Sequence, residues 1–415
     1  MRMVSDARRA LRLMPFRAIS YAPGTDLAAV ICPPYDVIGS RALEEFEAAD
    51  PHNIVHLTLP RPGAADGDRY LFAAEQLRRW RRAGVLRRDT SPALYVYEHR
   101  TATGAAAIGL VGGVGLDGPI LPHENTFPGP VADRAALMTA TRAQFEPILL
   151  TYDGDGAASD VVDAAAAAAP DLEVSVGADV HRIWRVSDAD SLTDVSADLA
   201  DRSALIADGH HRFAAYRAVH AAHPHEPGSG YGLALLVDAT RHPLELRGVH
   251  RSIAGLSFDD AVAGAAKGFD VVPLAASDDP LGRLSVEGST AFLVGTGDRR
   301  VLLRSARPGV LDDAIPAGRP DRWRHLDSAV LVDVVLAHLW NIDDADERVS
   351  YHHDIGDALR MSQRTGGVAV LVRPPALADV LALADGGARM PRKSTSFGPK
   401  PWTGLLMRDL AADDT

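Results

Sequence analysis

Short apolar runs alternate with amphipathic stretches along most of this chain. Apolar runs bounded by turn residues predict strands, and apolar positions that recur every three or four residues predict helices. The predicted strands cover residues 28–32, 93–97, 108–114, 148–152, 204–206, 232–237, 291–294, 301–304 and 368–372. The predicted helices cover residues 69–85, 133–145, 212–222, 326–340 and 377–384. This mixture predicts an α/β fold, with mixed sheets of the α+β kind.

Loops and changes of pattern predict how the chain is divided. Residues 61–67 are rich in glycine, proline and aspartate, and residues 153–170 run from an Asp/Gly segment into a tract of alanines, where a helix can also form. With 415 residues, the chain has room for two or three domains. We expect a boundary near residue 256. An N-terminal region, residues 1–256, would contain the site, and the tail at 386–405 of an α/β C-terminal region, residues 257–415, would return to it.

The composition narrows the class of protein. A hydrophobic share of 47% and a charged share of 24% are ordinary for a globular protein with no membrane-embedded part. Residues 1–16 carry arginines instead of the apolar stretch of a secretory signal, so we expect a cytoplasmic protein without membrane partners. The net charge of −12 disfavours a nucleic-acid partner, although a few local cations suffice to bind a nucleotide. The sequence leaves open whether the chain forms a homo-oligomer.

The cysteine content limits the redox and metal chemistry of the chain. Its single cysteine, Cys32, excludes an intramolecular disulfide and any multi-cysteine metal site. Cys32 ends the apolar run at 28–32, so we expect a buried side chain rather than a nucleophile.

The stretch Ala-Asp-Gly-His-His-Arg at residues 207–212 is the strongest candidate for chemistry. It joins a predicted strand to a predicted helix, and this geometry gathers backbone N–H groups and the positive end of a helix dipole, where phosphates bind. Gly209 lets the backbone approach a ligand, and Arg212 offers a planar cation to phosphate oxygens. His210 and His211 can exchange protons near neutral pH. The alternative is a tight turn in which the aspartate caps the helix and both histidines are solvated.

A proline-rich segment near the N-terminus offers a candidate carboxylate. Pro-Pro-Tyr-Asp-Val-Ile at residues 33–38 follows the predicted strand 28–32, and the two prolines would end that strand and fix an extended turn. Asp36 would then lie at the carboxyl end of a strand, where α/β sites gather, as a general base or a metal ligand. The alternative is a turn-capping aspartate ahead of a helix that begins at Ser40.

Polar residues also surround a Pro-Gly-Pro sequence that predicts a rigid loop. His-Glu-Asn-Thr at residues 123–126 precedes this loop, and Asp133 and Arg134 follow it. Histidine beside glutamate suits acid–base or metal chemistry, which makes Glu124 and Asp133 candidate ligands of Mg²⁺. Alternatively, both carboxylates cap the following helix and pair with Arg134.

The C-terminal tail resembles a phosphate-binding loop without being one. Arg392 stands where a Walker A loop requires its second glycine, which excludes a P-loop NTPase. The tail still carries two cations, Lys393 and Lys400, and the hydroxyl of Ser394 on a segment fixed by prolines. These groups suit an anionic ligand. The alternative is an exposed tail with scattered charge.

Taken in order, these segments resemble the family catalogued as domain of unknown function ten-fifteen, over nearly the whole chain. The motifs that carry the resemblance lie at residues 33–38, 53–57, 123–126, 133–134, 207–212, 250–251, 351–354, 390–400 and 404–405. The chain departs from the family pattern at Asn125, where a basic residue is usual, and near Val131, where a lysine is usual. This protein could therefore use a different phosphate donor, or have a different activity, from other members of that family.

The turn at 207–212 is also similar to the phosphate-binding turn of ParB-like proteins, a group that includes the free-serine kinases and the ParB CTPases. The resemblance implies a core like that of ParB and the serine kinases. It also implies phosphoryl transfer from ATP, ADP or pyrophosphate, with Mg²⁺, to a small hydroxyl substrate. Free L-serine, giving O-phosphoserine, is the first candidate. The alternative is a ParB-like nucleotide-binding and nucleotide-hydrolysing regulatory switch without a small-molecule substrate.

The expected mechanism assigns a role to each candidate residue. Asp36 is the expected base, with Glu124 second, and His210 or His211 assists proton transfer. Glu124 and Asp133 hold Mg²⁺ through water. The residues expected to bind the donor's phosphates are Asp208, Gly209, Arg212, Arg134, Lys393, Ser394 and Lys400.

Overall fold

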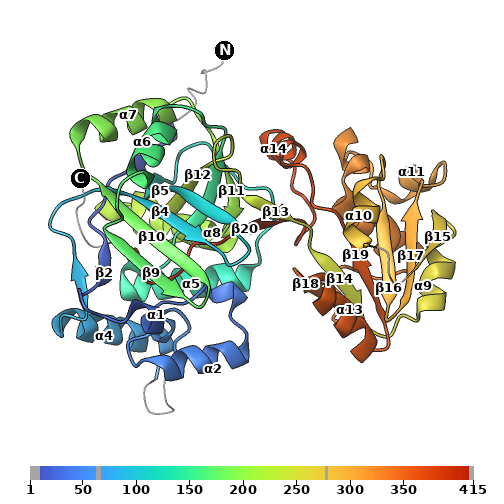
Figure 1. Ribbon diagram of the computed structural model, residues 1–415, viewed down its shortest axis with the longest axis horizontal. Helices are drawn as coiled ribbons and strands as arrows, with labels where there is room; N and C mark the ends of the chain where they lie inside the picture. Colours follow the sequence, from blue (N-terminus) through green and yellow to red (C-terminus); the bar gives the residue numbers. More distant parts are fainter. Residues whose placement is uncertain (1–9, 62–66, 276–278, 411–415) are drawn as a thin grey trace. The chain divides into compact units, whose positions relative to one another are not determined.

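The computed structural model describes residues 10–61, 67–275 and 279–410, which form two compact units (Figure 1). The first unit holds residues 10–122, 126–245 and 398–410, and the second holds residues 123–125 and 246–397. Residues 1–9 of the arginine-bearing stretch at 1–16 and most of the predicted loop at 61–67 lie outside the described residues. Each unit combines helices with a sheet, so the predicted mixed α/β class is confirmed.

The elements of the first unit come mainly from the N-terminal part of the chain, with one short strand from the C-terminal tail. Its strands are β1 (Leu13–Met14), β2 (Ile19–Tyr21), β3 (Leu86–Arg88), β4 (Leu94–Arg100), β5 (Ala106–Gly115), β6 (Ile120–Leu121), β7 (Ala143–Gln144), β8 (Ile148–Tyr152), β9 (Leu172–Val176), β10 (Asp179–Val186), β11 (Ala204–Asp208), β12 (Tyr231–Asp238) and β21 (Arg408–Asp409). Its helices are α1 (Leu27–Val30), η1 (Tyr35–Val37), α2 (Ser40–Ala49), α3 (Val55–Thr58), α4 (Arg69–Arg82), α5 (Pro128–Thr141), α6 (Ala157–Ala166), α7 (Ala189–Leu199), α8 (His210–Ala222) and η2 (Pro227–Gly230).

The chain passes between the units through β13 (Glu245–Arg247) and β20 (Ser396–Gly398). The strands of the second unit are β14 (His250–Ile253), β15 (Asp270–Leu274), β16 (Phe292–Thr296), β17 (Arg299–Arg304), β18 (Val349–His352) and β19 (Val368–Leu371). Its helices are α9 (Phe258–Ala265), α10 (Pro280–Ser285), α11 (Val310–Ala314), η3 (Asp321–His325), α12 (Asp327–Val330), the π-helix η4 (Leu331–Leu339), α13 (Ile355–Arg364) and α14 (Leu377–Asp385).

Two sheets organise the units. The main sheet of the first unit runs β6-β11-β8-β12-β5-β4-β10-β9, with β1 beside β5. β8 pairs in parallel with β12 but antiparallel with β11, which makes this sheet mixed. The second unit has an antiparallel sheet in the order β15-β17-β16-β19-β14-β18.

The predicted domain boundary near residue 256 is corrected to residues 245 and 246. β14 pairs with β18 and β19, so the segment before residue 256 belongs to the sheet of the second unit. The tail beyond residue 398 belongs to the first unit, whereas residues 386–397 stay in the second. The weak sequence signal at 256 marks the loop after β14 rather than the passage between units.

The predicted strand at 28–32 is wrong. Residues Leu27–Val30 form the short helix α1, in which the Ile31 N–H donates to the Leu27 carbonyl (3.1 Å). A five-residue apolar run cannot distinguish a buried strand from a buried helical turn. Asp26 occupies the N-cap position of this turn, but its side chain makes no capping hydrogen bond. Cys32 then makes an isolated antiparallel bridge with Thr403 of the C-terminal tail.

The Pro-Gly-Pro loop is also corrected, because these residues begin α5 at Pro128. Proline is tolerated in the first turn of a helix, where its missing N–H has no helical partner. The helix ends at Thr141, with Arg142 in a left-handed conformation (φ 55°), and residues 143–144 form β7 instead of continuing the predicted helix.

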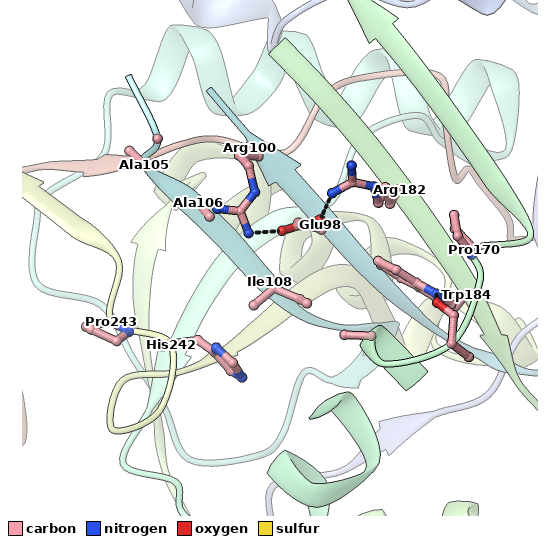
Figure 2. Close-up of a pocket in the computed structure, with 13 residues that line it drawn as sticks. Glu98, Arg100, Ala105, Ala106, Ile108, Pro170, Arg182, Trp184, His242 and Pro243 are labelled. Atoms are coloured by element: carbon pink, nitrogen blue, oxygen red, sulfur yellow. Dashed lines mark hydrogen bonds and ion pairs between the residues drawn. The ribbon is translucent and has the colours of Figure 1, made fainter. Parts of the chain in front are cut away.

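Alternation along β4 and β10 gives the two faces of the main sheet different environments. Glu98 lies opposite Arg182 in the register, and these side chains line a hollow of about 660 Å³ (Figure 2). Their neighbours His99 and His181 point to the other face, because successive side chains of a strand alternate. There they contact the C-terminal tail around Trp402.

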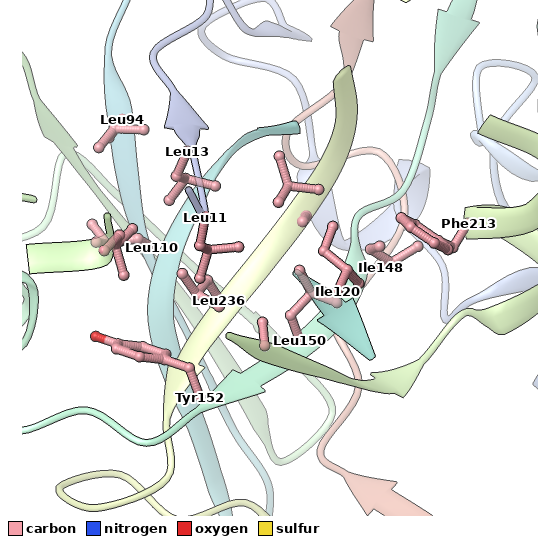
Figure 3. Packing of buried hydrophobic residues seen from close by; sticks show 14 of the residues in the cluster. Leu11, Leu13, Leu94, Leu110, Ile120, Ile148, Leu150, Tyr152, Phe213 and Leu236 are labelled. Carbon is pink, nitrogen blue, oxygen red and sulfur yellow. The ribbon is translucent and has the colours of Figure 1, made fainter. Parts of the chain in front are cut away.

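The hydrophobic core of the first unit joins its strands to α8. Leucine and isoleucine side chains from β1, β4, β5, β6, β8 and β12 pack together, and Phe213 of α8 belongs to the same cluster (Figure 3). In the described part of the chain, no helix has the length and apolar character needed to cross a bilayer.

Candidate functional site

The strand-to-helix turn predicted at 207–212 is present at the junction of β11 and α8. β11 ends at Asp208, Gly209 adopts a left-handed conformation (φ 95°), and α8 begins at His210. A Cβ atom at Gly209 would lie 2.7 Å from Ile148 Cγ2, so only glycine fits between this turn and the start of β8. The turn therefore brings the N-terminus of a 13-residue helix close to the main sheet.

Arg212 is buried beneath the turn rather than displayed on it. Its side chain is 1% exposed, and its Nη1 and Nη2 donate to the Pro147 carbonyl (2.7 Å) and to Asp208 Oδ2 (2.6 Å). Its Nε lies 3.7 Å from Glu146 Oε1. Burial disfavours the charged form, but Glu146 and Asp208 outweigh burial and raise the pKa of Arg212 above its usual value. The expected fork for phosphate oxygens is thus corrected: Arg212 braces the turn.

Lys400 connects the turn to the proline-rich segment. Its Nζ lies 3.4 Å from Asp36 Oδ2 and forms a closer ion pair with Asp208 Oδ1. Burial opposes the charge on Lys400, but Asp208 and Asp36 outweigh burial and raise its pKa above the usual value. The side chains of Asp36 and Lys400 remain 33% and 20% exposed, so a ligand can reach them from solvent.

The position of Lys400 is fixed by the segment that carries it. The Lys400 carbonyl lies 2.9 Å from His99 Nδ1, and the Trp402 N–H donates to the Tyr97 hydroxyl (3.2 Å). The Thr403 N–H donates to the Cys32 carbonyl (2.8 Å). These bonds attach the tail to β4 and to the segment immediately before Asp36.

Glu146 is a site residue that the sequence did not reveal. It is 5% exposed, and its Oε2 accepts from the Thr403 hydroxyl (2.8 Å) and from the Tyr35 N–H (3.3 Å) while Oε1 faces Arg212. A buried carboxylate is costly unless it is paired and hydrogen-bonded, and here one carboxylate ties together three separate segments. The available sequence signal was a single glutamate, Glu146, followed by Pro147 and then by an apolar run.

Arg134 and Asp133 support the same region from α5. The Arg134 guanidinium lies over the Tyr35 ring (4.3 Å to the centroid), and its Nη1 donates to the Thr58 carbonyl (2.8 Å). Asp133 Oδ2 accepts from Arg134 Nε (2.7 Å) and Nη2 (2.5 Å), and its Oδ1 accepts from the Tyr70 hydroxyl (2.8 Å) and from Arg69. A cavity of about 20 Å³, which is enough for one water, lies beside Arg134.

Asp133 does not fit its predicted role as a magnesium ligand. Both of its oxygens already accept bonds from cationic or hydroxyl donors. Burial favours its neutral form, but Arg134 and Tyr70 outweigh burial and lower its pKa. Within the described residues, no cluster of three His, Cys, Asp or Glu side chains is arranged to hold a metal ion.

The two histidines of the turn have different surroundings. His211 Nε2 accepts a hydrogen bond from the Phe127 N–H (3.0 Å), and the two rings stack with centroids 5.9 Å apart. Because Nε2 is an acceptor in this bond, His211 is neutral with its proton on Nδ1. His210 is the first residue of α8 and is 9% exposed.

Glu124, Lys393 and Ser394 belong to the second unit and form a cluster there. The Ser394 N–H donates to Glu124 Oε1 (3.3 Å), and the Ser394 hydroxyl donates to the Pro391 carbonyl (2.5 Å). Lys393 is exposed and adopts a left-handed conformation (φ 52°). The structure thus brings Glu124 and Ser394 together within this unit, and their predicted roles in phosphoryl transfer stay predictions.

A family model described as "Protein of unknown function (DUF1015)" matches residues 13–329. The chain belongs to this family. Among curated proteins, none matches the sequence.

Several solved structures match this chain at low similarity. SbnI with a C-terminal truncation from Staphylococcus aureus is 12% identical, and the match covers 74% of this chain and 90% of that chain at a TM-score of 0.38. A free serine kinase in complex with AMP is 15% identical, with 70% and 90% covered and a TM-score of 0.36. A conserved hypothetical protein from Pyrococcus furiosus is 15% identical, with 71% and 94% covered and a TM-score of 0.36. At these TM-scores, the matches carry no inference about activity.

Proposed function

We propose that this DUF1015 protein transfers a phosphoryl group from ATP, ADP or pyrophosphate to the hydroxyl of a small substrate, with free L-serine as the first candidate. The observation that carries the proposal is the position of Lys400 between Asp36 and Asp208. This cation joins a partly exposed carboxylate to a glycine turn at a helix N-terminus. Phosphoryl transfer to an alcohol needs a base, a counter-charge and a phosphate cradle of this kind.

The N-terminus of α8 would hold the phosphates of the donor. The first N–H groups of a helix have no partner within the helix, and the helix dipole adds partial positive charge there. His210 opens this helix, so a donor phosphate at the turn would lie beside it. Arg212 contributes from below as a buried positive charge that holds Asp208 in place.

Asp36 would accept the proton of the substrate hydroxyl. The hydroxyl oxygen attacks the terminal phosphorus, a P–O bond forms, and the bond from phosphorus to the leaving phosphate breaks with its electron pair. The proton moves to the Asp36 carboxylate. Lys400 would exchange part of its interaction with Asp36 for the phosphate oxygens as charge builds on them.

Magnesium enters this proposal as the complex that it forms with the phosphates of the donor. Mg²⁺ keeps several waters and needs few protein carboxylates in such complexes. Because Asp133 is occupied by arginine and tyrosine donors, no step is assigned to it. Glu124 belongs to the second unit, and its role as a magnesium ligand stays a prediction.

The test is to incubate the purified protein with each donor, Mg²⁺ and L-serine, and to follow phosphorus NMR for a phosphomonoester signal. We expect donor consumption and phosphomonoester formation in equal amounts, and D36N should abolish both. D190N, an exposed aspartate of α7, is the matched control and should leave the rate unchanged. Donor hydrolysis that is independent of serine and of other amino acids or polyols would instead favour a nucleotide-binding switch.

A further inference from the structure

A second pocket lies on the first unit, on the face of β4 and β10 that does not contact the Lys400 segment. Its volume is about 660 Å³, and the side chains around it come from β4, β5, β10, the end of α6 and the loop that follows β12 (Figure 2). On the opposite face, His99 and Tyr97 bind the tail near Lys400. Because neighbouring residues of a strand point to opposite faces, the pocket and the candidate active site are separate.

The pocket has a built arrangement of charge. Glu98 is 5% exposed, and its two oxygens accept from Arg100 Nη2 (2.5 Å) and from Arg182 Nη1 (2.8 Å). Figure 2 shows the carboxylate between the two guanidinium groups at one edge of the hollow. The arginine side chains remain 50% and 31% exposed. The buried Glu98 carboxylate therefore orients two arginine side chains that remain accessible to solvent.

The charged side chains at the pocket pair with one another. Arg100 and Arg182 share the carboxylate of Glu98, and Arg182 Nε also pairs with Glu173 (2.6 Å), which lies outside the lining residues. His242 also lines the pocket and is paired with Asp163 (2.8 Å). Arg100 is half exposed, so its guanidinium still presents N–H donors that an anionic group can reach from solvent.

The opposite wall of the pocket is apolar. Trp184 and Ile108 are buried in the edge of the core, and the Trp184 indole N–H donates to the Ala168 carbonyl (3.0 Å), which fixes the ring. Ala166 and Ala106, which is opposite Arg100 in the register, line the pocket with small side chains, which leaves room for a ligand. A fixed aromatic ring next to open space suits a flat or apolar ligand body.

We propose that this pocket binds a small organic anion that has one carboxylate or phosphate group and an apolar body. The anionic group would receive hydrogen bonds from Arg100 and Arg182, and the apolar body would lie against Trp184 and Ile108. This proposal does not depend on phosphoryl transfer, because none of these residues belongs to the Lys400 network.

The experiment measures binding by isothermal titration with four probes. Benzoate and phenyl phosphate carry the apolar body and the anionic group, benzamide lacks the charge, and acetate lacks the body. We expect one of the two aromatic anions to bind at least about tenfold more tightly than benzamide and acetate. The preferred anion then decides between a carboxylate and a phosphate ligand.

Variants locate the binding. R100Q and R182Q should each weaken binding of the preferred anion by about tenfold, and A106F should abolish binding by filling the space beside Arg100. R78Q, on the exposed surface of α4, is the matched control and should bind like the wild type. Circular dichroism and thermal melting confirm that each variant is folded.

Three results would overturn the proposal. The first is a folded wild type that binds neither aromatic anion at millimolar concentration. The second is benzamide binding as tightly as benzoate. The third is unchanged binding in the folded R100Q, R182Q and A106F variants.

Discussion

Lys400 Nζ lies 3.4 Å from Asp36 Oδ2, although 364 positions of the sequence separate the two residues. The same nitrogen pairs with Asp208, so one cation connects the proline-rich segment, the turn before α8 and the C-terminal tail. This three-residue relationship is the centre of the proposed activity, and it gives the first prediction.

K400M should lower the rate of phosphomonoester formation by roughly 10²-fold, because the cation that balances charge on the transferred phosphate is lost. The rate is measured by phosphorus NMR with the serine assay. K267M removes an exposed lysine of the second unit and is the matched control. A folded K400M protein with the wild-type rate would remove Lys400 from the mechanism.

G209A should destabilise the first unit more than G177A does. Both glycines have positive φ (95° and 61°), so alanine is strained by roughly 1–2 kcal/mol at each. Only at Gly209 does the new Cβ also meet Ile148, whereas nothing lies within 4 Å at Gly177. We expect G209A to lose about 2 kcal/mol more than G177A in urea unfolding, and equal losses would contradict the close packing of the turn.

E146Q should lower the free energy of unfolding by about 3 kcal/mol, because it removes one of the carboxylates that compensate the buried Arg212. The amide keeps the shape of the side chain, so the effect reports on charge. E75Q, at a partly exposed glutamate that pairs with arginines of α4, should change the stability little. Similar urea midpoints for E146Q and wild type would show that Asp208 alone satisfies Arg212.

His181 should make the first unit sensitive to acid. Burial, with a smaller contribution from His99, lowers the pKa of His181 to about 3, while an unfolded histidine titrates near pH 6.5. Below pH 6.5 the unfolded state takes up a proton that the folded state refuses, so stability falls by up to about 1.4 kcal/mol per pH unit as the pH drops toward 3. Above pH 6.5 this contribution is fully present.

Hydrogen exchange of β4 and β10 at pH 7, 6 and 5 measures this effect. Exchange, corrected for its intrinsic pH dependence, should report weaker protection at pH 5 in the wild type. H181Q should flatten the trend, and H225Q, at an exposed histidine, should keep it. A pH trend that persists in H181Q would assign the acid sensitivity to other groups.

Cys32 should resist alkylation in the folded protein. Its side chain is buried, and burial, reinforced by Glu146, raises the pKa of the thiol well above its usual value, so little thiolate forms. Iodoacetamide at pH 8 followed by mass spectrometry should find Cys32 unmodified in the native state and modified in urea. Rapid labelling of the native protein would show that the tail around Thr403 opens.

Local pattern predicted the elements that hold the candidate site better than it predicted their partners. An apolar run followed by Asp-Gly-His-His indicated a strand, a turn and a helix, and β11 and α8 confirm this order. The run at 28–32 was too short to separate helix from strand, so the element before Asp36 was assigned wrongly.

Long-range pairing was beyond the reach of the pattern. Nothing in the periodicity relates Thr403 to Cys32 or to Glu146, yet these bonds set where Lys400 lies. The burial of Arg212 could not be predicted either. The sequence pattern of an arginine after a glycine turn is the same whether its guanidinium faces a ligand or the Pro147 carbonyl. Burial of a charge is decided by the whole fold.

The return of the tail to the first unit has a consequence for biosynthesis. β21 pairs with β7, and Met407 bridges to Ile19, so the earliest-made strands are completed by residues near position 408. A ribosome must translate the entire inserted second unit before it releases these last pieces. The early segments therefore remain incompletely assembled while the second unit is synthesised. A premature stop codon anywhere before residue 400 would eliminate the lysine that joins the two aspartates.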